Sequence, residues 1–232
     1  MIIQGLQKIS LLDYPEKVSC TVFLSGCNFK CPFCHNASLV ISEKIGSQNK
    51  ITDLEFFEFL KTRIRKLDGV CITGGEPLLR SDLEGFIKSI KDLGFLVKLD
   101  TNGYNPKALK DIVNTGMIDF VAMDIKNSQE HYSLSVGVPD LDIKKICESV
   151  SFLLSETVPF EFRTTIVEEL HTEEDLIRIG EWIQGTEDYY LQQFVDSGDV
   201  ITNGLHSPTI EKMERYKDII ESYVPNVKLR GI

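Results

Sequence analysis

Three cysteines lie within eight residues of the chain, at Cys27, Cys31 and Cys34, in the stretch GCNFKCPFCHN. Thiolates bind soft and borderline metal ions, and they also carry out redox chemistry. In a reducing compartment, cysteines spaced this closely are more often metal ligands or catalytic groups than structural disulfides. The question is therefore which metal or redox centre uses three thiols with no fourth nearby.

Four kinds of site fit this spacing to different degrees. A structural zinc site takes four ligands, and His35 is a poor fourth one because it adjoins Cys34. A c-type haem attached at CPFCH leaves Cys27 without a role, and so does a thioredoxin-like pair of Cys31 with Cys34. A cubane iron–sulfur cluster would use all three thiolates and keep one iron open for a small molecule. The CxxxCxxC spacing favours the cluster, and a non-catalytic zinc module stays as the alternative.

The composition is that of an ordinary globular chain. It has 232 residues, 42% of them hydrophobic and 26% charged, which is enough to bury a sizeable core. The net charge of −10 argues against a nucleic-acid partner, because phosphates require basic surfaces. The sequence contains no signal peptide and no apolar run of about 20 residues, so we expect a cytoplasmic protein with no membrane partner. The other cysteines are interpreted as buried small hydrophobic residues: Cys20, Cys71 and Cys147.

Predicted strands and helices alternate along the chain. Strand patterns cover 18–24, 69–73, 95–101, 118–126, 159–167 and 189–195. Helix patterns cover 51–67, 81–94, 105–116, 142–156, 172–185 and 208–224, and a last strand is expected within 226–232. Two capping boxes are predicted, Thr52 with Glu55 and Ser81 with Glu84.

Six strand–helix units in this order predict parallel pairing with right-handed crossovers. We therefore expect an α/β fold, a partial (β/α)6 barrel of TIM type, with a doubly wound sheet as the competitor. The prediction is a single domain over 1–232, with a short N-terminal extension at 1–17 and a C-terminal helix and strand at 208–232. The polar stretch 196–207 is predicted to be a mobile loop.

Polar motifs follow the predicted strands. The cysteine loop follows the first strand, GGEP at 74–77 the second, DTNG at 100–103 ends the third, DIK at 124–126 ends the fourth, and Arg163 lies in the fifth. In barrels of this type the chemistry sits at the carboxyl ends of the strands. Each motif alone is compatible with a plain turn, but their joint placement indicates one functional site.

The motifs resemble those of the radical S-adenosylmethionine (SAM) enzymes. The run LLDYPEKVSCTVFLSGCNFKCPFCHN, with GGEP, LDTNG and DIK, is similar to the activating enzymes of glycyl radical enzymes. Among these it most resembles the activators of anaerobic ribonucleoside-triphosphate reductase. The resemblance covers nearly the whole chain, most specifically residues 9–37 and 71–126.

The resemblance implies a [4Fe–4S] cluster on Cys27, Cys31 and Cys34, with SAM chelating the open iron. It implies SAM contacts from Phe33, His35, Gly74, Gly75, Glu76, Pro77, Asp100, Thr101, Asn102, Asp124, Ile125, Lys126 and Arg163. The glycines would let the backbone approach the methionine end, and the cations would bind the SAM carboxylate. Asp100, Thr101 and Asp124 resemble the oxygen ligands of a monovalent cation.

The implied reaction is reductive cleavage of SAM, followed by abstraction of a hydrogen atom from a glycine Cα of the partner. No acid or base residue is required for that abstraction. Flavodoxin or ferredoxin would be the reductant, and the expected partner is the anaerobic reductase, with its target glycine on a flexible loop. The alternatives are a different glycyl radical enzyme as partner, or a radical SAM enzyme that acts on a small molecule, against which the short chain argues.

Overall fold

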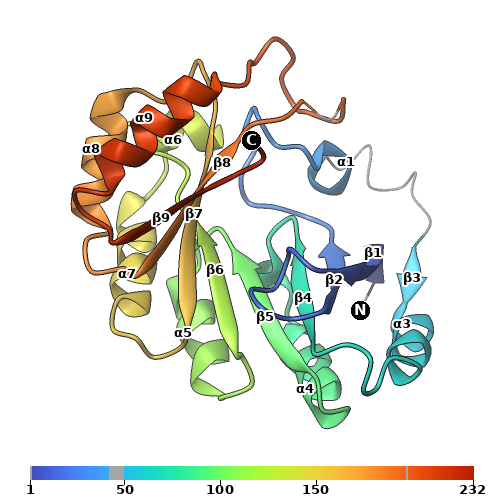
Figure 1. Cartoon of the computed structure of the whole chain (residues 1–232). Helices are drawn as coiled ribbons and strands as arrows, with labels where there is room; N and C mark the ends of the chain where they lie inside the picture. The colour runs from blue at the N-terminus through green and yellow to red at the C-terminus, as the bar shows by residue number, and fades with distance from the viewer. Residues whose placement is uncertain (1, 42–49, 197) are drawn as a thin grey trace. The chain divides into compact units, whose positions relative to one another are not determined.

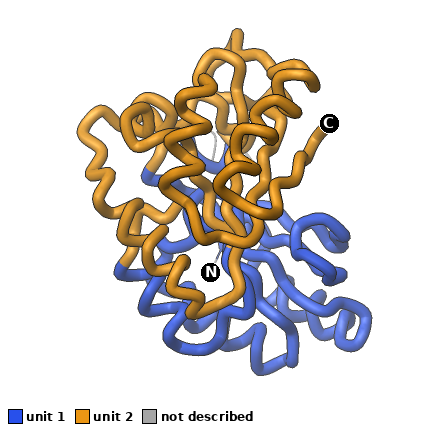
Figure 2. Tube along the Cα trace, turned by 60° about the vertical axis from the view of Figure 1, so that its left-hand side comes forward, with its two compact units in different colours: residues 1–28, 38–101, 107–121 blue, residues 29–37, 102–106, 122–232 orange. Residues whose placement is uncertain are grey.

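The computed structural model describes residues 2–41, 50–196 and 198–232. The chain divides into two compact units, each built from three segments of the sequence (Figure 2). Unit 1 contains Met1–Asn28, Ser38–Thr101 and Lys107–Val121, and unit 2 contains Phe29–Ala37, Asn102–Pro106 and Ala122–Ile232. That these units form a single domain stays a prediction.

The strands of unit 1 are ordered β3-β1-β2-β4-β5 (Figure 1). Their bounds are β1 (Ile2–Ser10), β2 (Ser19–Leu24), β3 (Ile51–Thr52), β4 (Gly69–Gly74) and β5 (Leu96–Thr101). β1 pairs antiparallel with β2 and β3, whereas β2, β4 and β5 are parallel. Leu24 lies opposite Gly74, so the segments that follow β2 and β4 leave the sheet at the same edge.

The helical elements that begin near or within unit 1 are α1 (Ala37–Val40), α3 (Asp53–Lys61), the 3-10 helix η1 (Pro77–Leu79), α4 (Leu83–Asp92) and α5 (Pro106–Asn114). The capping box of Thr52 and Glu55 is confirmed at the start of α3. The predicted box of Ser81 and Glu84 is wrong, because α4 begins after Asp82 and has no side-chain cap. α4 buries one apolar face against the sheet and ends ahead of Gly94, whose φ is +86°.

Unit 2 contains the strand order β6-β7-β8-β9, in which β6 (Phe120–Asp124) starts in unit 1 and ends in unit 2. The others are β7 (Phe160–Ile166), β8 (Asp188–Gln193) and β9 (Asn226–Arg230), and they pair in parallel. The helices are α6 (Tyr132–Val136), α7 (Ile143–Leu153), α8 (Glu173–Trp182) and α9 (Ile210–Ile220). α8 and α9 pack side by side (Figure 1). The largest fully buried side chains of this core include Tyr132, Phe162, Tyr189 and Tyr216.

The α/β fold with mostly parallel strands is confirmed, because a described strand lies within or across each of the six predicted ranges and helices separate them. The predicted N-terminal extension is different, since most of it forms β1. Its sequence IIQGLQKIS alternates only partly between apolar and polar residues, so its period-2 signal is weak. Residues 196–207, of which residue 197 lies outside the described part, contain no helix or strand where the structure describes them. No helix of the described part is long and apolar enough to span a bilayer.

Candidate functional site

The segment with the three cysteines passes from unit 1 to unit 2 between Asn28 and Phe29. Cys27 therefore belongs to unit 1, and Cys31 and Cys34 belong to unit 2. Cys31 is buried, and the other two are half-buried.

In unit 2 the cysteine segment is folded into a tight turn. The Cys34 amide donates to the Cys31 carbonyl at 3.0 Å. Upstream, the Lys30 amide donates to the carbonyl of Val136 in α6 at 2.9 Å, and Phe29 packs against Tyr104 with 5.4 Å between ring centroids. Because these anchors come from separate elements, the turn is held in place by its surroundings as well as by its own hydrogen bond.

In unit 1 the GGEP turn packs directly on the backbone that leads into Cys27. The Gly75 amide donates to the Leu24 carbonyl, and the Glu76 amide donates to the Gly26 carbonyl, both at 2.8 Å. A Cβ on Gly75 would lie 2.0 Å from the Gly26 oxygen, and one on Gly74 would lie 2.3 Å from the Leu24 oxygen. Gly74 also has a φ of +120°. The structure therefore gives both glycines a reason that sequence reasoning missed, namely close packing of one backbone on another.

Glu76 is a buried carboxylate that organises this turn. It is 2% exposed, and its Oε1 accepts from the Leu78 amide at 3.1 Å and from the Thr101 hydroxyl at 2.8 Å. Pro77 follows it at the first position of η1, where a missing amide hydrogen costs nothing. Glu76 and Thr101 were both predicted to contact SAM, and the structure shows that they hydrogen-bond to each other.

Asp100 has a lysine partner within the same strand. The Lys98 ammonium lies 2.5 Å from Asp100 Oδ1, and the two side chains are 1% and 13% exposed. The Cys71 thiol lies 3.7 Å from the same carboxylate oxygen and 4.0 Å from the ammonium. Side chains two residues apart on a strand share one face, which explains why Lys98 and Asp100 meet.

Three predicted residues of unit 2 form one charged group. The Arg163 Nε lies 2.9 Å from Asp124 Oδ1, and the Lys126 ammonium lies 3.0 Å from Asp124 Oδ2. Burial alone would raise the pKa of Asp124, but the two cations outweigh it and hold that pKa well below its usual range. Burial likewise disfavours the charged form of Lys126, but the charge of Asp124 and, to a smaller extent, that of Cys31 raise the pKa of Lys126 above its ordinary value. The group keeps one net positive charge and fixes the direction of both cations.

The positive charge of Lys126 acts on side chains of the cysteine turn. The Lys126 ammonium lies 5.9 Å from the centre of the Phe33 ring. Burial raises the pKa of the Cys34 thiol, an effect that Lys126 partly offsets. Burial and the neighbouring Lys126 lower the pKa of His35, so its imidazole is neutral at pH 7. Ile125, fully buried, joins β6 to β7 through its amide, which donates to the Arg163 carbonyl at 2.8 Å.

A polar network behind the end of β6 was missed by sequence reasoning. The buried His171 places Nε2 3.0 Å from the Lys126 carbonyl, and its Nδ1 accepts from the Val167 amide at 3.1 Å. Burial lowers the pKa of His171. Asn127 donates to Ser135 at 2.9 Å and to the Leu170 carbonyl at 2.8 Å. No local pattern marked these residues, because their partners lie up to 45 positions away in the chain.

Asn102 and the metal predictions remain partly open. The Asn102 side chain accepts from the Tyr104 amide at 3.0 Å, so it shapes the turn after β5. Within the described ranges, no three His, Cys, Asp or Glu side chains, cysteines included, lie close enough together to hold a metal ion. The cation prediction also loses its electrostatic reason, because Asp100 and Asp124 each have cationic partners in their own unit.

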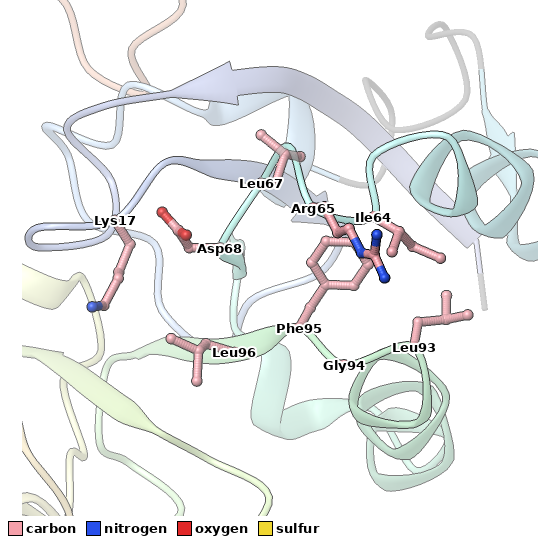
Figure 3. Close-up of a pocket in the computed structure, with 9 residues that line it drawn as sticks. All are labelled: Lys17, Ile64, Arg65, Leu67, Asp68, Leu93, Gly94, Phe95 and Leu96. Carbon is pink, nitrogen blue, oxygen red and sulfur yellow. The ribbon is translucent and has the colours of Figure 1, made fainter.

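A separate pocket of about 400 Å³ lies at the amino ends of β4 and β5 (Figure 3). Asp68 comes just before β4, Phe95 comes just before β5, and Leu96 is the first residue of β5. Lys17 and Arg65 contribute its cationic side chains. None of the predicted site residues lines it, so we do not connect it with the chemistry of the cysteine loop.

Comparison with known proteins identifies the family. Residues 21–183 match the Radical SAM superfamily. The chain belongs to this superfamily. A protein of Methanocaldococcus jannaschii, provisionally named a glycyl-radical enzyme activating enzyme, is 32% identical over 239 residues, covering 100% of this chain and 96% of its own.

Two solved structures show the same fold. One is a domain of a pyruvate-formate lyase-activating enzyme from Bacteroides vulgatus, with a TM-score of 0.58 and 18% identity over 70% of this chain and 99% of that one. The other is Streptococcus suis SuiB bound to its precursor peptide SuiA, with a TM-score of 0.71 and 14% identity over 91% of this chain and 48% of that one. The radical SAM fold that the motifs predicted is confirmed, and the protein is an enzyme of that superfamily.

Membership of this superfamily implies a [4Fe–4S] cluster and SAM, and the residues present fit both groups in type. Cysteine thiolates are the usual ligands of iron–sulfur clusters, and three of them would leave one iron of a cubane cluster open. Lys126 lies near Cys31, and a neighbouring ammonium favours the thiolate that ligation requires. The net positive charge of Asp124, Lys126 and Arg163 suits a carboxylate ligand. Which individual residues bind each group remains a proposal.

Proposed function

We propose that this enzyme is an activase that generates a glycyl radical on a partner protein. The observation that carries the proposal is the similarity over the whole chain to the M. jannaschii protein named for that activity. The cysteine spacing and the charged group of Asp124, Lys126 and Arg163 support it. In this proposal Cys27, Cys31 and Cys34 hold the cluster.

The chain's own residues bind and orient SAM. Arg163 and Lys126 would bind the SAM carboxylate, and Asp124 would hold the two cations in one direction so that little side-chain order is lost on binding. The GGEP backbone, Glu76 and Pro77 would contact the methionine end, and Asn102 the ribose. Phe33 and the neutral His35 would line the adenine. When bound, the cluster and SAM would supply the one-electron chemistry that removes a hydrogen atom from a glycine Cα of the partner protein.

The finer assignment is the anaerobic ribonucleoside-triphosphate reductase as partner, with flavodoxin or ferredoxin as reductant. The motif resemblance over 9–37 supports the reductase. A different glycyl radical enzyme is the second candidate, because activators share the same SAM machinery. We do not carry the monovalent cation into this proposal, since fixed cations already neutralise Asp100 and Asp124.

The test is electron paramagnetic resonance on the reconstituted enzyme mixed anaerobically with the reductase, SAM and a reductant. We expect a glycyl doublet on the reductase. Cys34→Ala should abolish it, whereas Cys147→Ala, which removes a half-buried thiol from α7, should leave it unchanged. A doublet that forms only on another glycyl radical enzyme would reassign the partner, and SAM cleavage that survives Cys34→Ala would overturn the ligand assignment.

A further inference from the structure

The segment after β8 reaches over to the cysteine turn and returns. We call residues 199–207 the strap. At its base, the His206 amide donates to Glu169 Oε2 at 3.0 Å, and the Glu168 amide donates to the His206 carbonyl at 3.0 Å. The Ser207 hydroxyl also donates to the Phe194 carbonyl at 2.5 Å. These bonds fix the base of the strap to the ends of β7 and β8, although the segment contains neither helix nor strand.

The far end of the strap contacts the cysteine turn on both sides of Cys34. The Thr202 amide donates to the Pro32 carbonyl at 2.9 Å, and the Ala37 amide donates to the Asp199 carbonyl at 3.2 Å. Val200, between the two contacts, is 8% exposed and anchors the strap in the core. Thr202 itself has an exposed side chain, so its main chain is the part that makes the contact.

From this geometry we infer that the strap positions the cluster-binding loop, and that residues 199–202 hold Cys31 and Cys34 ready to bind iron. The inference rests on the proposed role of these two cysteines as ligands. Its basis is that a six-residue stretch, Pro32 to Ala37, is tied at both ends by a segment more than 160 positions later in the chain. A ligand loop that is ordered before binding loses less entropy when the metal arrives.

The other flank of the cysteine segment is held by α6. The Lys30 amide donates to the Val136 carbonyl at 2.9 Å, and a Cβ on Gly137 would lie 2.5 Å from the Lys30 oxygen. The cysteine segment is therefore held from two sides, and the strap supplies the side nearer Cys34.

The experiment removes one hydrogen bond without removing a side-chain contact. Thr202→Pro deletes the amide hydrogen that bonds Pro32, whereas Thr202→Ala keeps it. Ile201→Pro is the matched control, because it introduces a proline at the adjacent residue, for whose amide the structure shows no hydrogen bond among the described residues. On metal-free full-length protein, we expect iodoacetamide to alkylate Cys31 and Cys34 about five to ten times faster in Thr202→Pro, as loss of one hydrogen bond allows. Cys147 should react at an unchanged rate in all variants.

A second readout follows the cluster itself. Thr202→Pro should lose iron to a chelator faster than wild type, and the electron paramagnetic resonance spectrum of its reduced cluster should be broader. Thr202→Ala should behave as wild type in both measurements. If Thr202→Pro fails to fold, Val200→Ala loosens the same anchor more mildly and should shift both readouts in the same direction. Equal alkylation rates in wild type and Thr202→Pro would overturn the strap proposal. Because that arm uses metal-free protein, its result is independent of whether the proposed function holds.

Discussion

Replacing Lys98 with Met should destabilise the enzyme more than its position in a strand suggests. The side chain is 1% exposed, and its ammonium is 2.5 Å from Asp100. At an effective dielectric constant of about 20, two unit charges at this distance attract by roughly 7 kcal/mol. Desolvation of both groups offsets much of that attraction, so the pair itself adds little net stability. Removing only the lysine takes away the ammonium that faces the largely buried carboxylate of Asp100, and such a loss costs about 3 kcal/mol.

The assay is urea unfolding of the metal-free chain, followed by circular dichroism. Lys88→Met is the matched control, because Lys88 pairs with Asp92 at 2.8 Å while both side chains are 66% and 63% exposed. An exposed pair of this kind contributes only about 0.5 kcal/mol. The double variant Lys98→Met with Asp100→Asn should recover most of the lost stability, since it removes the largely buried carboxylate together with its ammonium.

A loss below about 1 kcal/mol in Lys98→Met would refute the reasoning, because it would place Asp100 in contact with water. The same holds if the double variant is no more stable than the single one. Either result would also return Asp100 to the set of residues that need an external cation.

Three further predictions concern the site and its surroundings. Gly75→Ala should lower the free energy of unfolding by about 2 kcal/mol and should also reduce iron loading, because its Cβ would lie 2.0 Å from the Gly26 oxygen next to Cys27. Gly85→Ala, whose Cβ meets open space, should change neither quantity. As the pH falls below 6.5, the free energy of unfolding should decrease by up to about 1.4 kcal/mol per pH unit. The reason is that burial lowers the pKa of His171, so the unfolded chain takes up the proton first. A His171→Gln variant with an equally steep pH profile would contradict this. SAM affinity, measured by calorimetry, should be equal in potassium, sodium and choline salts, and a requirement for potassium would restore the predicted cation site.

Much of the fold follows from hydrophobic periodicity. Val97 and Leu99 alternate with Lys98 and Asp100, and the strand lies where this pattern predicts. β1 was missed because Gly5 interrupts its pattern and its register with β2 shifts at two places, between Ile3 and Gly5 and between Gln7 and Ser10. The start of α4 was also misjudged, because a capping sequence indicates a helix start only when the backbone enters it in extended form, and Asp82 has φ −93° and ψ 4°.

The types of the site residues were easier to predict than their partners. Asp124 and Lys126 follow from the DIK motif at a strand end, Arg163 follows from its place within the next strand, and the structure brings the three together. The partner of Asp100 had a visible signal, since a lysine inside the apolar run FLVKLD must either reach water or meet a charge, and the acid two residues on shares its face. His171 had no such signal, because its bonds to Lys126 and Val167 depend on where β6 and β7 end in space.

The GGEP turn shows how a correct residue can be chosen for an incomplete reason. The resemblance implied that Gly74 and Gly75 let the backbone approach the methionine end of SAM. If that were their only role, a side chain at Gly75 would weaken SAM binding and leave the cluster unaffected. In the structure the same glycines make room for the backbone of residues 24–26, which leads directly into Cys27. A side chain at Gly75 would therefore move a neighbour of the proposed ligand before it met SAM. The two effects separate experimentally, because iron loading responds to the first and SAM affinity of the loaded enzyme to the second.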